Sequence, residues 1–139
     1  MPERGIARIF VRNDRSVFMQ SLENHLENVR FLASMLEELQ NIPSEFHEEL
    51  LKACRLHDWG KRATFRLVLD GKAPFGFTYS FRGHPYVTLP GDPPPLVEAL
   101  VRGHHDYSVK GIVRAAGSLS DGKIRRHYAR LLYLLELAD

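Results

Sequence analysis

Apolar residues recur at helical spacing in four parts of the chain. After Ser21, a leucine or valine comes every three or four residues up to about residue 40, at Leu22, Leu26, Val29, Leu32, Leu36 and Leu39. That spacing is typical of an amphipathic helix, and Ser21 has the side chain of a helix N-cap. Similar stripes run over residues 44–60, 95–104 and 122–139. The pattern therefore predicts four main helices.

The segments between these helices have weaker patterns. Residues 6–18 contain two short β-rich runs around Asn13 and Asp14, which predict a short N-terminal hairpin or an irregular lead-in. Residues 63–69 are expected to form a short helix, whereas residues 72–95 are so rich in proline that they predict a long loop. Residues 108–121 are interpreted as a further connection. The expected fold class is all-α: a compact bundle of about five main helices with long loops, in a single domain over residues 1–139.

Composition narrows the classes of protein that fit. The chain has 139 residues, of which 44% are hydrophobic and 26% charged, and its formal charge of +2 permits an anionic partner without requiring one. Its apolar runs are too short for a bilayer span, and the first residues lack the apolar core of a signal peptide. Cys54 is the single cysteine, so an internal disulfide is excluded. We expect a cytoplasmic protein that does not associate with membranes.

Ionisable residues interrupt the apolar stripes. His25 lies between Leu22 and Leu26, and three other residues continue the apolar face of a predicted helix: His57, His104 and Asp139. A single histidine on such a face is more often a hydrogen-bonded core residue than a ligand. Burying an unpaired imidazole or carboxylate costs several kcal/mol, however, and here the feature recurs on four helices. The recurrence indicates a shared partner, and a metal ion is the simplest candidate.

The order of these residues resembles a known family. The phrases SLENHLENV, ACRLHDWGK, FRGHPY and LVRGHHDYS, followed by Asp139, are similar to motifs of the HD superfamily of metal-dependent phosphohydrolases. Within that superfamily they are most similar to the HD nuclease domain of the CRISPR type I interference nuclease-helicase. The resemblance covers residues 21–139 and implies an HD-domain helical bundle.

The resemblance implies two metal sites and their ligands. The first metal would be bound by His25, His57, Asp58 and Asp139, and the second by Asp58 together with His84, His104 and His105. Asp58 and Lys61 would be catalytic, with Lys61 holding a phosphate oxygen. Imidazole-rich sites favour Mn, Fe, Co or Ni, with Mg as a further option. Neighbours in a regular helix point about 100° apart, so His104 and His105 reach one ion only if their helix ends there.

The resemblance also implies a substrate and partners. The expected activity is metal-dependent hydrolysis of phosphodiester bonds in single-stranded DNA during CRISPR interference, by a monomer acting with a separate or detached helicase and the effector complex. Cations expected to contact the strand are Arg62, Arg66, Arg82, Lys110 and Arg114. Aromatic residues of the proline-rich loop would either pack it onto the domain or stack on bases: Phe75, Phe77, Tyr79, Phe81 and Tyr86. Two alternatives remain: an HD phosphohydrolase acting on small nucleotides, and a non-catalytic interaction module stabilised by metal.

Overall fold

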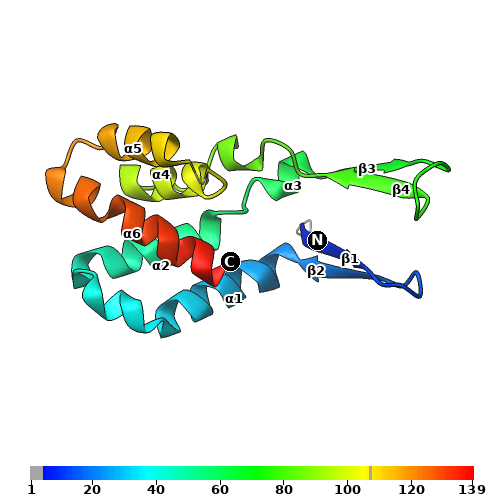
Figure 1. Ribbon diagram of the computed structural model, residues 1–139, viewed down its shortest axis with the longest axis horizontal. Coiled ribbons are helices and arrows are strands. Elements are labelled where there is room, and N and C mark those ends of the chain that lie inside the picture. Colours follow the sequence, from blue (N-terminus) through cyan, green and yellow to red (C-terminus); the bar gives the residue numbers. More distant parts are fainter. Residues whose placement is uncertain (1–4, 107) are drawn as a thin grey trace.

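The chain folds into a helical body from which two β-hairpins extend (Figure 1). The computed structural model describes residues 5–106 and 108–139. The main helices are α1 (Leu22–Met35), α2 (His47–Leu56), α4 (Pro95–Gly103), α5 (Val109–Gly117) and α6 (Gly122–Ala138). The expectation of a mostly helical protein is confirmed. The expectation of an all-α fold is wrong in one respect, because two pairs of antiparallel strands are present.

Helix α6 lies between the other helices and joins them into one core. Figure 1 shows α1 and α2 on one side of α6 and α4 and α5 on the other, and α6 contacts all four. The largest fully buried side chains of α6 are those of Tyr128, Leu131, Leu132, Leu134 and Leu135. They meet Leu50 of α2 and Leu100 of α4, which are also fully buried. Because apolar burial is the main stabilising term, this core fixes where the helix ends lie.

The first two helices stop earlier than the apolar stripes suggest. The Ser21 hydroxyl caps α1 by accepting from the backbone N–H of Asn24 at 3.2 Å. Leu36 is extended, and the chain then forms the 3₁₀ turn η1 (Glu37–Asn41) in place of a continuous helix. After the 3₁₀ turn η2 (Ser44–Phe46), α2 ends at Leu56, so residues 57–60 form a turn. His57, the first residue of this turn, keeps helical backbone angles of φ −57° and ψ −37°.

The segment expected to be a short helix and then a loop forms a second hairpin. The four-residue helix α3 (Lys61–Thr64) is followed by strand β3 (Arg66–Leu69), which pairs antiparallel with β4 (Phe77–Ser80). The predicted helix over 63–69 is wrong because its last four residues, Arg-Leu-Val-Leu, find a strand partner in the region interpreted as loop. The rest of that region includes the 3₁₀ turn η3 (His84–Tyr86).

Helix α5 occupies the region interpreted as a connection. Ser108 caps it by accepting from the backbone N–H of Gly111 at 2.9 Å. None of its residues is fully buried, but Ile112, Ala115 and Ala116 pack against the core formed by the other helices. Their contact with α4 and α6 stabilises a helix that a short and glycine-containing sequence specifies weakly.

The predicted N-terminal hairpin is confirmed. Strand β1 (Ile6–Val11) pairs antiparallel with β2 (Val17–Ser21), and Ala7 packs on Leu22 and Leu26 of α1. Figure 1 shows that both hairpins extend from the same side of the helical body. The Tyr79 hydroxyl of β4 donates to the Ile9 carbonyl of β1 at 3.4 Å, which links the two. Among the described residues, no helix is both long and apolar enough to cross a membrane.

Cys54 offers a test of the packing of α2. The thiol is fully buried, and burial together with the nearby Asp139 carboxylate raises its pKa to about 12. Because the thiolate is the reactive form, we expect iodoacetamide at pH 8 to modify the native protein far more slowly than the urea-unfolded chain. Mass spectrometry of the adduct measures both rates. Equal rates would contradict the packing of α2 described here.

Candidate metal centre

Asp58 lies at the centre of the site, in the turn after α2, and is almost completely buried. One of its carboxylate oxygens, Oδ2, faces the first ligand group, which consists of His25, His57 and Asp139. The Nε2 atoms of His25 and His57 lie 3.1 and 3.5 Å from this oxygen. Asp139 Oδ1 lies 3.1 Å from His25 Nε2 and 3.4 Å from His57 Nε2. Four ligand atoms from α1, the turn after α2 and the residue after α6 therefore surround one point.

The other oxygen of Asp58, Oδ1, faces the second ligand group, which consists of His84, His104 and His105. The Nε2 atoms of His84 and His104 lie 3.0 and 3.2 Å from it. His105 Nε2 lies 3.1 Å from His84 Nε2. In each half of the site the ligand atoms lie within 4.8 Å of one another. Each half can hold one metal ion, and the Asp58 carboxylate connects the two halves.

The local backbone explains how His104 and His105 reach the same place. Helix α4 ends at Gly103, and His104 (φ −68°, ψ −10°) and His105 lie in the turn that follows it. His84 is brought in by η3, where Gly83 has a positive φ of 84° that favours glycine. Gly60 allows this turn to lie close, because a Cβ there would be 2.1 Å from the His84 carbonyl oxygen. The positions of His104 and His105 thus depend on the turn after α4, and the position of His84 depends on the glycines at 83 and 60.

Three imidazoles are oriented by the same local hydrogen bond. The Nδ1–H of His57 donates to the Cys54 carbonyl at 2.7 Å and that of His84 to the Phe81 carbonyl at 3.0 Å. His104 Nδ1–H donates to the Val101 carbonyl in the same way. A carbonyl only accepts, so each Nδ1 carries the proton, and in the neutral ring each Nε2 presents a lone pair to the centre. Such backbone contacts are typical of histidine ligands to metals.

The centre consequently collects acceptors that cannot satisfy one another. His84 Nε2 and His104 Nε2 are 3.3 Å apart, and both face Asp58 Oδ1. Neutral rings in this tautomer have no hydrogen to share, so lone pairs would oppose one another inside the protein. Placing a positive charge between them removes the repulsion, and a divalent cation does so with all its ligands in place. The donor set therefore fits a metal ion in each half.

The electrostatics of the individual groups agree with this arrangement. Burial raises the pKa of Asp58, but its contacts with the imidazoles of His104, His25 and His84, which can carry positive charge in the metal-free protein, outweigh burial, so the pKa lies far below its usual range. Burial and the neighbouring imidazoles of His104 and His84 lower the pKa of His105 to about 4. At neutral pH Asp58 is ionised and His105 is neutral. Both are in the state that a metal ion requires.

Two cationic side chains contact the carboxylates of the first half of the site. Lys61 Nζ lies 2.8 Å from Asp58 Oδ2 and donates to the Ala7 carbonyl at 2.9 Å. Two of its three N–H donors are thus used, and its contact with a phosphate remains a prediction. Arg8 of β1 donates to the carboxylate of Asp139 at 2.9 Å and to its backbone carbonyl at 3.0 Å. Sequence analysis missed Arg8, because nothing in a β-rich run indicates a partner 131 positions away.

The cations predicted to contact a strand are not gathered at one opening. Arg82 borders a cavity next to His84 and His105, and Arg114 borders a second cavity between α4, α5 and α6. Lys110 is exposed on α5. Arg62 lies over the Trp59 ring at 4.1 Å, and Arg66 donates to the carbonyls of Ala63 and Phe65. Of these five cations, Arg82 borders the cavity that His84 and His105 also line.

Comparison with known proteins identifies no relative of this chain. The chain matches no model of a protein family, no curated protein and no solved structure. The chemistry of the centre is therefore the basis for a functional proposal.

Gly60 provides a test of the second half of the site. Gly60→Ala places a Cβ against the His84 backbone, so we expect His84 to shift and metal affinity to fall about 10-fold or more, as when groups that orient ligands are lost. Isothermal titration with Mn²⁺ measures affinity and stoichiometry. Gly71→Ala is the matched control, since nothing lies within 4 Å of a Cβ there. Unchanged binding by Gly60→Ala would contradict the assigned ligands.

The stabilisation that metal gives should increase with pH. Burial lowers the pKa of His25, but its contacts with Asp139 and Asp58 outweigh this and raise the pKa in the metal-free protein, whereas the pKa of His105 is lowered. A histidine whose pKa is higher in the folded protein than in the unfolded chain stabilises the fold at pH values below its unfolded pKa. This stabilisation is lost as the pH rises through the folded pKa. Metal binding requires deprotonated imidazoles and strengthens with pH.

We therefore expect the increase in Tm caused by Mn²⁺ to be larger at pH 8 than at pH 5.5, because protons compete less with the metal for the imidazoles at the higher pH. Differential scanning calorimetry with and without a chelator measures the Tm of both forms at each pH. A metal effect that is absent, or larger at pH 5.5, would contradict the proposed centre.

Proposed function

We propose that this protein is a metal-dependent phosphodiesterase that hydrolyses single-stranded DNA. The observation that supports this most directly is the Asp58 carboxylate, whose two oxygens each face a separate group of ligands. A carboxylate shared between two adjacent cation sites is the arrangement expected for two-metal hydrolysis of a phosphodiester. The resemblance of the histidine motifs to HD phosphohydrolases supports the same reaction.

The ligand chemistry favours first-row transition ions. Five imidazoles and two carboxylates fit Mn, Fe, Co or Ni better than Mg, which prefers oxygen ligands. Bound ions of this kind polarise a phosphodiester and activate water for attack. The residues of the chain hold the ions, keep Asp58 ionised and orient the imidazoles through their bonds to backbone carbonyls.

The second half of the site is the side that a substrate can reach. His84 and His105 border a cavity of about 560 Å³, here called the entrance cavity, together with Arg82 and Arg102. In the first half of the site, Arg8 already forms a hydrogen bond with the Asp139 carboxylate, and Lys61 already forms an ion pair with the Asp58 carboxylate. A phosphate group is attracted by the two arginines and would meet the centre at His84 and His105. Single-stranded DNA as substrate, and a separate helicase of CRISPR interference as partner, are proposals that rest on the resemblance.

The proposal is tested with labelled oligonucleotides and Mn²⁺, Fe²⁺, Co²⁺, Ni²⁺ or Mg²⁺. We expect metal-dependent cleavage of a single strand, reduced about 100-fold or more by Asp58→Asn, which removes the negative charge and one of the two oxygens shared between the sites, and by His57→Ala, which removes a ligand. Gel electrophoresis of the products measures the rates. His47→Ala is the matched control, because His47 bonds only to the Ile42 carbonyl at 2.8 Å, outside the centre.

The result also distinguishes the two alternatives. Hydrolysis of nucleoside monophosphates or cyclic nucleotides, without cleavage of a strand, would replace the proposal with a small-nucleotide phosphohydrolase. Bound metal without hydrolysis of any phosphodiester would indicate an interaction module. Equal cleavage by the wild type and both site variants would assign the activity to a contaminant.

A further inference from the structure

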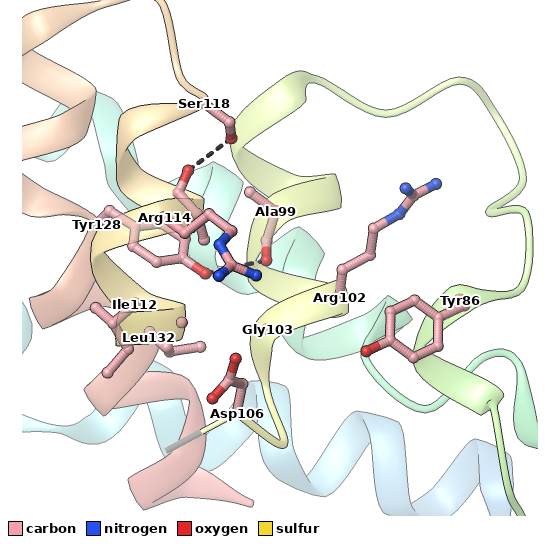
Figure 2. Close-up of a pocket in the computed structure, with 12 residues that line it drawn as sticks. Tyr86, Ala99, Arg102, Gly103, Asp106, Ile112, Arg114, Ser118, Tyr128 and Leu132 are labelled. Atoms are coloured by element: carbon pink, nitrogen blue, oxygen red, sulfur yellow. Dashed lines mark hydrogen bonds between the residues drawn. The ribbon is translucent and has the colours of Figure 1, made fainter. Parts of the chain in front are cut away.

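A second cavity adjoins the entrance cavity and continues away from the metal centre. It has a volume of about 330 Å³ and lies between α4, α5 and α6 (Figure 2). The two cavities share Tyr86, Arg102 and Asp106. Figure 2 shows Tyr86 and Arg102 on one side of the second cavity and Tyr128, Ile112 and Leu132 on the other. A molecule longer than one phosphate group can therefore reach from the centre into this cleft.

The second cavity has an apolar floor, and polar side chains such as Arg102 and Asp106 lie at its edge. Its floor consists of Ala99, Ile112, Ala115, Leu132 and the ring of Tyr128. The Tyr128 hydroxyl donates to the Ala99 carbonyl at 3.1 Å, which fixes this wall, and burial raises its pKa to about 12 so that it stays protonated. Flat apolar walls of this kind suit an aromatic ring, and the volume is in the range of small-ligand sites.

We propose that this cavity, here called the base pocket, binds one unpaired nucleobase of the strand whose phosphate lies at the metal centre. This inference rests on the proposed function, since it takes a polynucleotide to be the substrate. A base can enter such a pocket only when it is unstacked and unpaired. The pocket would thus be the source of selectivity for single strands over duplexes.

Two exposed side chains lie where the two cavities meet. They could contact the nucleotide that joins the metal centre to the base pocket. Tyr86 is 72% exposed although it borders both cavities, so its ring is free to stack on a base. Arg102 has a side-chain exposure of 52% and pairs with Glu98 at 2.6 Å, which leaves donors for a phosphate oxygen. Neither residue belongs to the ligand set. Both are therefore positioning residues for the strand.

Asp106 limits where phosphates can lie. Its carboxylate accepts from the backbone N–H and the hydroxyl of Ser108, at 3.0 and 2.7 Å, and these bonds lower its pKa. An ionised carboxylate repels phosphate, so the backbone of the strand should follow the side of Arg102. The same carboxylate can accept from the exocyclic amino group of adenine, cytosine or guanine, and thymine has no such donor at that position.

The test measures binding separately from cleavage. The full chain loaded with Mn²⁺ is titrated against fluorescent phosphorothioate strands, which resist hydrolysis: an oligodeoxyadenylate and an abasic strand of equal length. We expect the wild type to bind the base-containing strand about 10-fold more tightly, as one stacked base allows. Tyr86→Ala and Ala115→Phe, which fills the pocket, should bring this ratio close to one, while Arg102→Ala should weaken binding of both strands.

Each variant has a matched control with the same chemical change elsewhere. Tyr133→Ala removes an exposed tyrosine of α6, and Val113→Phe adds a ring to the exposed side of α5. Arg55→Ala removes an arginine of α2 that pairs with Glu27 as Arg102 pairs with Glu98. The controls should keep the wild-type affinities and ratio, and circular dichroism shows that every variant is folded.

The possible results separate the base pocket from the proposed function. A ratio that depends on Tyr86 and Ala115 supports the pocket even if the wild type cleaves no strand, in which case the nuclease proposal fails alone. Cleavage of single strands with a ratio unaffected by Tyr86→Ala and Ala115→Phe overturns the pocket alone. A wild type that does not bind either strand, or binds both equally, also overturns it.

Discussion

The structure depends on one electrostatic constraint: lone pairs of imidazoles and carboxylates face one another inside the protein and need positive charge between them. Asp58 lies at the centre of this arrangement: Oδ1 faces the Nε2 atoms of His84 and His104, and Oδ2 faces Nε2 of His25 as well as the Lys61 ammonium. Burying such a group without a cation is costly. The helices supply the geometry, and the backbone carbonyls of Cys54, Phe81 and Val101 set the tautomer of three rings. Ligand atoms arranged in this way could hold a metal ion in each half of the site.

The helix ends give the centre its shape. His57 and Asp58 follow α2, His104 follows α4 and Asp139 follows α6, so these ligands gather where three helices end. The core holds these ends at fixed positions, since α6 packs against both α2 and α4. The precision needed for several ligands thus comes from packing of leucines and valines at a distance from the polar atoms.

Periodicity predicted α1, α2, α4 and α6 because their apolar stripes are long and locally specified. The same stripes revealed the centre, since His25, His57, His104 and Asp139 stand where an apolar residue would be expected. Strand β3 was missed because its pairing with β4 is not local, and α5 because contact of Ile112 with the core stabilises it more than its own sequence does. Arg8 and the approach of Gly60 to His84 are tertiary contacts, which leave no periodic signal.

The contact between Arg8 and Asp139 spans 131 positions of the sequence. A nascent chain leaving the ribosome carries every histidine of the centre long before residue 139 is added. During that interval the core lacks α6, and the imidazoles have neither their last carboxylate nor a closed environment. If the first ligand group binds a metal ion, its four ligands can be complete only after residue 139 has been made, and contacts between such remote segments are expected to form slowly.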